Sequence, residues 1–165
     1  MFKNLFQKKV KTQTEEIYSP LNGEVISLAE VPDPVFSNKM MGDGIAIIPK
    51  EGKLVSPVEG KIVQVFPTKH AIGIKSVNGV EILIHVGLET VDLRGEGFET
   101  FVEEGQSVKV GDVLSTFDIH FLESKNKEIV TPIIITNTLE KLDNMDQVST
   151  SEVSRQELLL KCNLK

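Results

Sequence analysis

Residues 71–86, AIGIKSVNGVEILIHV, place two runs rich in Ile and Val on either side of Asn78-Gly79. β-Branched residues favour strands, and an Asn-Gly pair between two such runs is typical of a tight hairpin turn, because both residues tolerate positive φ. We therefore predict an antiparallel hairpin with a two-residue turn. In that register Ile72 would lie opposite His85.

Short runs of the same kind continue on both sides of this hairpin. All 12 glycines lie between Gly23 and Gly111, which favours strands and turns over long helices. The sequence predicts an antiparallel all-β sandwich or barrel, with a short helical turn in 118–128 and a last strand or short helix at 157–161. The expected strands are 24–28, 44–48, 61–66, 71–77, 80–86, 98–102, 108–114 and 129–135.

An internal repeat indicates that the sandwich is duplicated. The segments SPLNGEV (19–25) and SPVEGKI (56–62) share the pattern S-P-x-x-G-x-[VI]. A further unit at 102–112, VEEGQSVKVGD, resembles a turn of the biotinyl and lipoyl barrel-sandwich domains. No lysine stands at a hairpin tip as those domains present theirs, which argues against a role as their kind of carrier.

Length, charge and cysteine count argue against several classes of protein. The 165 residues suit one domain, and 18 basic against 24 acidic side chains give a net charge of −6, which argues against nucleic acid as a partner. The single cysteine, Cys162, cannot form an internal disulfide, and no apolar run approaches the roughly 20 residues of a membrane-spanning helix. We expect a cytoplasmic protein.

The N-terminus differs in charge from the rest of the chain. Residues 1–18 hold four lysines and two glutamates, so residues 19–165 carry 14 basic and 22 acidic side chains, a charge of −8. We predict a flexible, basic and amphipathic tail over 1–18 that could touch an anionic membrane, followed by a single domain over 19–165.

Two of the three histidines are expected to meet. In the predicted register His70 lies opposite Gly87 and diagonal to His85, at a typical separation of roughly 7–8 Å between Cα atoms. Gly87 would leave open space beside both rings. His120 lies outside this hairpin and is expected at the surface.

The residues around these histidines match a known family. The stretch GVEILIHVGLETV (79–91) resembles the phosphohistidine signature of the glucose-family enzyme IIA of the phosphoenolpyruvate-dependent sugar phosphotransferase system. TKHA (68–71) is similar to that family's second histidine motif, and the resemblance extends over about 19–135. It implies a phosphoryl carrier and phosphotransferase component, which takes a phosphoryl group from the histidine-containing phosphocarrier protein and passes it to a cysteine of a IIB domain.

The resemblance also implies roles for individual residues. His85 would be phosphorylated on Nε2, His70 would stabilise the phosphoryl group, Thr68 would orient His70, and a carbonyl at Gly87 would accept the Nδ1 proton of His85. An apolar ring for the partner proteins is implied at Val35, Phe36, Met41, Phe66, Leu83 and Val91. Two positions depart from the pattern: Glu89 stands where the family usually has Asp, and Leu83 where it often has Phe.

Other functions stay open on the sequence alone. Related sandwiches include zinc peptidases of the lysostaphin type, but a catalytic zinc generally needs three protein ligands and His70 with His85 supplies two. No cofactor is required, although a partner protein could complete a zinc site on His70 and His85. The third alternative is a non-catalytic carrier or regulatory module, which would keep the fold without phosphoryl transfer. Regulatory target proteins are a further possible class of partner for the enzyme IIA function. A relay surface used by two partners in turn favours a monomer.

Overall fold

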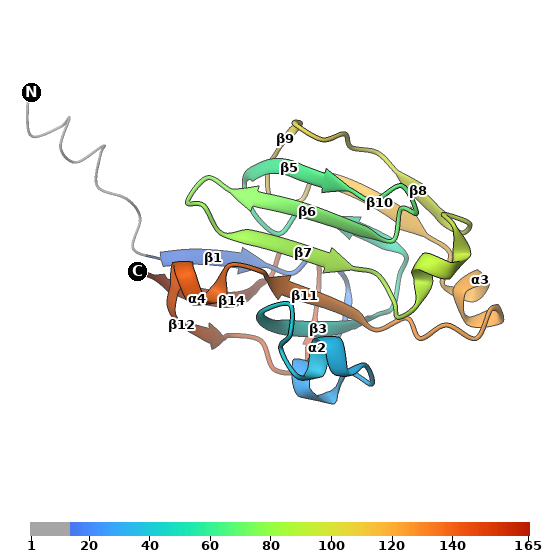
Figure 1. Ribbon diagram of the computed structural model, residues 1–165, viewed down its shortest axis with the longest axis horizontal. Helices are drawn as coiled ribbons and strands as arrows, with labels where there is room; N and C mark the ends of the chain where they lie inside the picture. Colours follow the sequence, from blue (N-terminus) through green and yellow to red (C-terminus); the bar gives the residue numbers. More distant parts are fainter. Residues whose placement is uncertain (1–13) are drawn as a thin grey trace, which may run out of the picture.

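The computed structural model describes residues 14–165, in which strands dominate (Figure 1). The strands are β1 (Thr14–Tyr18), β2 (Gly23–Ser27), β3 (Asp43–Pro49), β4 (Lys53–Val55), β5 (Gly60–Val65), β6 (Ala71–Ser76), β7 (Glu81–His85), β8 (Phe98–Thr100), β9 (Ser107–Val108), β10 (Val113–Phe117), β11 (Thr131–Ile135), β12 (Leu142–Gln147), β13 (Glu152–Val153) and β14 (Leu158–Leu164). The short helices are η1 (Leu28–Glu30), α2 (Pro34–Ser37), η2 (Thr90–Leu93), α3 (Ile119–Ser124) and α4 (Thr138–Lys141).

These strands form one large and two small sheets. The large sheet has the order β13-β2-β3-β11-β7-β6-β5-β9, and the small sheets have the orders β1-β14-β12 and β4-β10-β8. Neighbouring strands are antiparallel, as β3 and β11, β11 and β7, and β7 and β6 show in the middle of the large sheet. The predicted all-β sandwich with short helical turns is confirmed.

The central hairpin exists, but its predicted register is wrong by one residue. β6 pairs with β7 so that Ala71, and not Ile72, lies opposite His85. The turn has three residues: Ser76 N donates to Val80 O at 2.8 Å, and Gly79, at φ +91°, donates its amide to Ser76 O at 2.9 Å. This is the type I turn with a glycine bulge, which the Asn-Gly pair also permits.

The repeated Ser-Pro segments form matching turns. Ser19 and Ser56 are fully buried, and each hydroxyl donates a 2.7 Å hydrogen bond to the carbonyl two residues later, that of Leu21 or Val58. The residue before each serine donates its amide to the proline carbonyl after the other serine, at 3.0 Å in both directions. The two segments therefore pair with each other as equivalent halves of one duplicated fold.

A second pair of turns, at 109–112 and 154–157, extends the duplication. In each turn the first amide donates at 2.8 Å to the carboxylate of the fourth residue, Asp112 or Glu157. The third residue has positive φ in both, 93° for the glycine and 75° for Gln156. The sequence does not reveal this second repeat, because Gln156-Glu157 stands where the first turn has Gly111-Asp112.

The large sheet buries apolar side chains on both faces. Ile72, Ile74, Ile82 and Ile84 point toward the small sheets and belong to the main core, where each such side chain contributes about 1.5–3 kcal/mol of burial. On the other face a smaller cluster joins Ala71 and Leu83 to the η1–α2 segment. His85 alternates with Ile84 along β7, as Leu83 does, and so belongs to this second face.

The predicted N-terminal boundary needs correction. Thr14–Tyr18, assigned to the flexible tail, form β1 and pair with β14 along its length. Ile17 is fully buried, and Glu15 is buried as well. The neighbouring Glu15 and Glu16 made this segment look like a polar tail, although it is a strand with one face in the protein interior. Residues 1–13, on which the predicted membrane contact falls, lie outside the described residues.

The other differences concern the number of strands. The predicted strand 108–114 is divided into β9 and β10 by the turn at 109–112, and β4, β12 and β13 were not predicted. Among the helices that the structure describes, the longest, α3, has six residues, and none has the length and apolarity needed to span a membrane.

Candidate active site

His85 and His70 lie side by side on the second face of the large sheet. His85 is the last residue of β7, and His70 directly precedes β6, after Lys69 at φ +63°. Their ring centroids are 4.7 Å apart and their planes cross at 79°. The predicted meeting of the two rings is therefore observed, although the hairpin register used to argue it was wrong.

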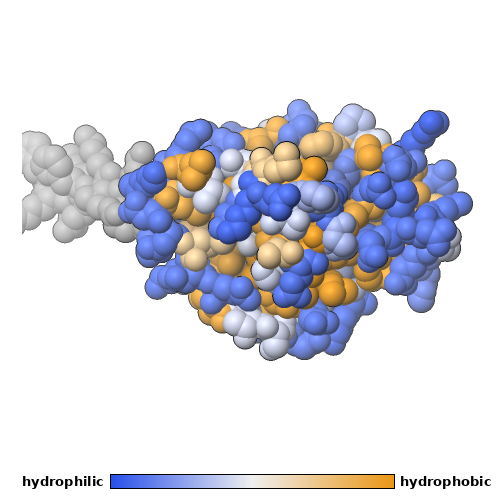
Figure 2. Space-filling view, turned by 60° about the horizontal axis from the view of Figure 1, so that its bottom comes forward, coloured by the Kyte–Doolittle hydropathy of each residue, from blue (hydrophilic) through white to orange (hydrophobic). Residues whose placement is uncertain are grey.

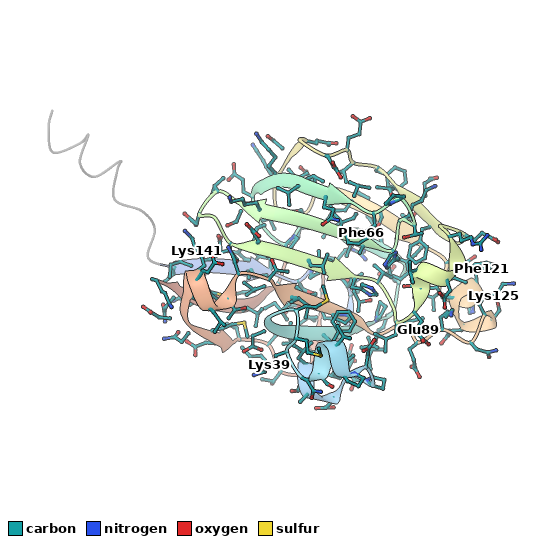
Figure 3. The ribbon with its side chains drawn as sticks, viewed as in Figure 1. Lys39, Phe66, Glu89, Phe121, Lys125 and Lys141 are labelled. Carbon is teal, nitrogen blue, oxygen red and sulfur yellow. The ribbon has the colours of Figure 1, made fainter. Side chains whose placement is uncertain are left out.

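The connection before β6 explains how the two rings meet. Ala71 lies opposite His85, so His70 falls one residue outside the paired strand, and the left-handed backbone of Lys69 reverses the chain there. Val86 N donates to His70 O at 2.7 Å and ties the two strand ends together. Phe66 and Glu89 mark the same end of the sheet, after β5 and β7 (Figure 3).

One nitrogen of each ring is engaged by a neighbour two residues away. His85 Nδ1 lies 2.7 Å from Gly87 O, and because a carbonyl oxygen only accepts, Nδ1 carries the proton. His70 Nδ1 lies 2.8 Å from Thr68 Oγ1, which can donate or accept. In neutral His85 the lone pair therefore lies on Nε2.

Gly87 is required by both backbone and space. Its φ is +74°, a conformation that other residues adopt at a cost, and a Cβ there would lie 2.6 Å from Thr90 Cγ2 and 2.8 Å from Glu128 O. The turn after β7 can therefore bring a carbonyl to Nδ1 only with glycine at this position.

Aromatic rings line the histidine pair. Phe36, on α2, lies 5.0 Å from the His85 ring, and Phe66 lies 5.4 Å from the His70 ring, both between centroids. The Asp33 carboxylate accepts the Val35 amide at 3.0 Å and caps α2, which places Phe36 against His85. His70 is 3% exposed and His85 is half-buried.

This environment keeps both rings uncharged. Burial, followed by the neighbouring His85, lowers the pKa of His70 to about 4. Burial also lowers the pKa of His85, while the bond to Gly87 and the charge of Asp33 act in the opposite direction. At neutral pH both imidazoles are therefore neutral, as a nitrogen nucleophile must be.

The residues expected in the partner ring divide into two groups. Val35, Met41 and Val91 are exposed, at 40%, 39% and 48%. Phe36 and Leu83 are buried and Phe66 is half-buried, and all three pack in the cluster on this face of the sheet. In the view of Figure 2, apolar side chains form separate patches among polar ones.

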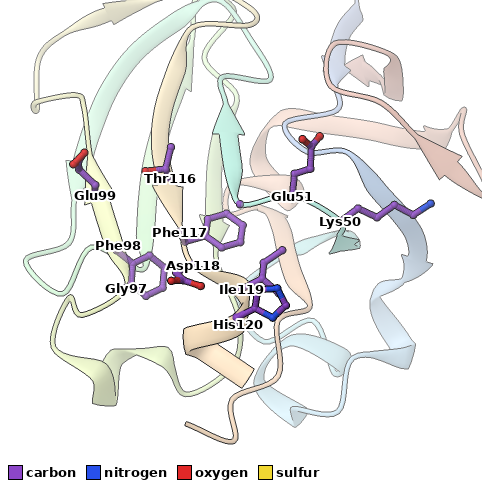
Figure 4. Close-up of a pocket in the computed structure, with 11 residues that line it drawn as sticks. Lys50, Glu51, Gly97, Phe98, Glu99, Thr116, Phe117, Asp118, Ile119 and His120 are labelled. Atoms are coloured by element: carbon purple, nitrogen blue, oxygen red, sulfur yellow. The ribbon is translucent and has the colours of Figure 1, made fainter. Parts of the chain in front are cut away.

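A cleft of about 750 Å³ lies apart from the two histidines (Figure 4). Figure 4 shows Glu99 and Glu51 on opposite sides of it and His120 with Ile119 at one end. His120 is exposed, as predicted. The acidic groups do not converge, and within residues 14–165 no cluster of three His, Cys, Asp or Glu side chains could hold a metal ion.

Cys162, the single cysteine, lies in the main core on β14. Burial, with the charges of Glu15 and Asp146, raises its pKa to about 12. It is therefore a protonated thiol without the nucleophilic character that a phosphoryl-accepting thiolate needs.

A family model confirms the resemblance that the histidine motifs suggested. The model described as the phosphoenolpyruvate-dependent sugar phosphotransferase system, EIIA 1, matches residues 15–141, which include both histidines and most of the fold. The chain belongs to this EIIA family. It is a phosphoryl carrier component of the sugar phosphotransferase system.

Individual relatives agree with this assignment along nearly the whole EIIA chain. The glucose-specific EIIA component of Bacillus cereus is 62% identical over 138 residues, 84% of each chain. That of Halalkalibacterium halodurans is 49% identical over 167 residues, 97% of this chain and 96% of its own. The solved glucose permease IIA of Mycoplasma capricolum is 43% identical, with a TM-score of 0.83 over 91% of this chain and 96% of its own.

These relatives do not support the alternative functions, the zinc peptidase and the non-catalytic module.

One residue beside the two histidines, Thr90, received no role from the sequence although it lies within the quoted signature. Thr90 is fully buried and its hydroxyl donates to Val86 O. The only sequence feature that pointed to Thr90 was its position as the next-to-last residue of the signature at 79–91.

Proposed function

We propose that His85 Nε2 is the phosphorylated nucleophile of this EIIA component. The observation that carries the proposal is the 2.7 Å contact of His85 Nδ1 with the Gly87 carbonyl, beside the His70 ring. It holds the proton on Nδ1 and leaves the Nε2 lone pair free for attack. The lowered pKa of the ring keeps that lone pair unprotonated at neutral pH.

The transfer balances without a separate acid or base. Nε2 forms a bond to phosphorus while the bond from phosphorus to the donor's histidine nitrogen breaks, and the donor ring leaves with its electron pair. The Nδ1 proton stays on His85, and the Gly87 carbonyl stabilises the positive charge that the ring gains. In the second step a thiolate of the acceptor attacks phosphorus, and neutral His85 leaves.

His70 is proposed to stabilise the phosphoryl oxygens. When the Thr68 hydroxyl donates to Nδ1, the proton of neutral His70 lies on Nε2, from which it can be donated to an oxygen. Its pKa of about 4 keeps His70 a neutral donor throughout the physiological range. Negative charge builds up on these oxygens during transfer, so a fixed donor there lowers the barrier.

Partner proteins are proposed to bind over the two histidines. The donor is the histidine-containing phosphocarrier protein and the acceptor is a IIB domain with a reactive cysteine. The exposed side chains of Val35, Met41 and Val91 offer apolar contact around the rings. The names of the relatives favour glucose as the sugar transported. A zinc ion shared between the two histidines and a partner, and regulatory target proteins, stay predictions.

Phosphorylation in a purified relay tests the proposal. The protein is incubated with phosphoenolpyruvate, enzyme I and the phosphocarrier protein, and its mass is measured. We expect the gain of one phosphoryl group, labile in acid and stable in base. His85→Gln should gain none, while the matched control His120→Gln should be phosphorylated like the wild type. Normal phosphorylation of His85→Gln would contradict the assignment.

A further inference from the structure

The turn that carries the Gly87 carbonyl is held by its neighbours. Val86 N donates to His70 O at 2.7 Å, and Leu88 N donates to Glu128 O at 3.0 Å. These two bonds fix the amides on either side of Gly87. The peptide between Val86 and Gly87 has its carbonyl oxygen 2.5 Å from Thr90 Oγ1, whose hydroxyl donates to it.

Thr90 contacts this turn with both branches of its side chain. The side chain is fully buried, and its Cγ2 lies 2.6 Å from where a Cβ of Gly87 would stand. The methyl group therefore packs directly against Gly87 while the hydroxyl holds the preceding carbonyl. A buried carbonyl without this donor would lack the hydrogen bond that such groups require.

A glycine has little conformational preference of its own, so its carbonyl is directed by its contacts. At Gly87 that direction matters because the carbonyl is the acceptor for His85 Nδ1. The Gly87 carbonyl belongs to the following peptide, whose Leu88 amide donates to Glu128 O, so the turn keeps its shape only while the peptides on both sides of Gly87 are held. The group that restrains the peptide before Gly87 is the Thr90 hydroxyl.

We propose that Thr90 is a positioning residue that keeps the proton of His85 on Nδ1 by fixing the turn at Gly87. The inference deepens the function proposed above and rests on it for its catalytic consequence. Thr90 touches no reacting atom: it acts through Val86 and Gly87 on the tautomer of His85. The hydroxyl, and not the shape of the side chain, has this effect.

Thr90→Val removes the hydroxyl and keeps the shape of the side chain. We expect nitrogen-15 NMR of the unphosphorylated wild type to show His85 with a protonated Nδ1 and an unprotonated Nε2. In Thr90→Val a mixture of the two tautomers should appear, and the rate of phosphoryl acceptance should fall by about tenfold, a size expected for one buried hydrogen bond. Thr90→Ser restores the hydroxyl and should restore both the spectrum and the rate.

Ser56→Ala is the matched control, because it also removes a buried hydroxyl that donates to a backbone carbonyl, away from the histidines. It should leave the His85 spectrum unchanged. The proposal is overturned if Thr90→Val keeps the pure Nδ1–H spectrum, or if Thr90→Ser loses it. Should Thr90→Val fail to fold, Thr90→Ala, which also removes the hydroxyl, is measured in its place, and a pure Nδ1–H spectrum of His85 in that variant would overturn the proposal. The spectra need no phosphate, so a failure of the relay assay in the wild type would contradict the proposed function separately.

Discussion

Gly87→Ala gives the sharpest prediction on how the turn after β7 is built. The new Cβ would lie 2.6 Å from Thr90 Cγ2 and 2.8 Å from Glu128 O, and the second of these is backbone that cannot rotate away. Positive φ costs a non-glycine residue about 1–2 kcal/mol, and forcing a methyl group into a packed site costs about 1–3 kcal/mol more. The free energy of unfolding should therefore fall by about 2–5 kcal/mol.

Gly105→Ala separates the two contributions. Gly105 has φ +91° but nothing within 4 Å of its Cβ position, so this variant should lose only the roughly 1–2 kcal/mol of backbone strain. Urea unfolding of both variants, followed by circular dichroism, measures the difference. Gly87→Ala should also accept phosphate more slowly, because its displaced carbonyl no longer holds His85 Nδ1. Equal stability of the two variants, with a normal rate for Gly87→Ala, would refute this reasoning.

Three further predictions concern titratable groups. Burial raises the pKa of Glu15, so the stability that the protonated Glu15 side chain contributes is lost as pH rises through that pKa. Glu15→Gln should therefore unfold at a higher urea concentration than the wild type at pH 8, but not at pH 4. Equal urea midpoints of the two proteins at pH 8 would contradict this. Because burial lowers the pKa of His85, the rate of phosphoryl acceptance should be constant around neutral pH and decline only in acid, and a decline beginning above pH 7 would argue against it. His70→Gln should accept phosphate but pass it on at least about tenfold more slowly in a relay assay, since it loses a donor to the phosphoryl oxygens; equal rates of both steps would exclude the role given to His70.

Most of the fold could be predicted because its central strands are rich in Ile and Val between glycine-containing turns. β3 and β7 follow this rule, whereas β6 and β11 are as rich in Ile but do not have a glycine-containing turn on each side. β1 does not follow it, because Glu15 points inward, where Ser76 Oγ and Asn78 donate to its carboxyl group. A single sequence does not show that a glutamate has such partners.

The sequence motifs and the family resemblance predicted the two histidines of the site better than the expected hairpin register did. The Asn-Gly pair allows turns of two or three residues, and local sequence does not decide between them. Ser76 does so in the structure, since its hydroxyl accepts the Val80 amide at 3.0 Å. The position of His70 further depends on the left-handed backbone at Lys69, for which no glycine gave a signal.

The bond between phosphorus and nitrogen in the phosphorylated protein tests the central claim most directly. Protein labelled with nitrogen-15 is phosphorylated by phosphoenolpyruvate, enzyme I and the phosphocarrier protein, and the coupling between phosphorus and nitrogen is recorded by NMR. We predict coupling to Nε2 of His85, with Nδ1 still protonated and hydrogen-bonded to Gly87. Coupling to Nδ1 of His85, or to either nitrogen of His70, would contradict the account.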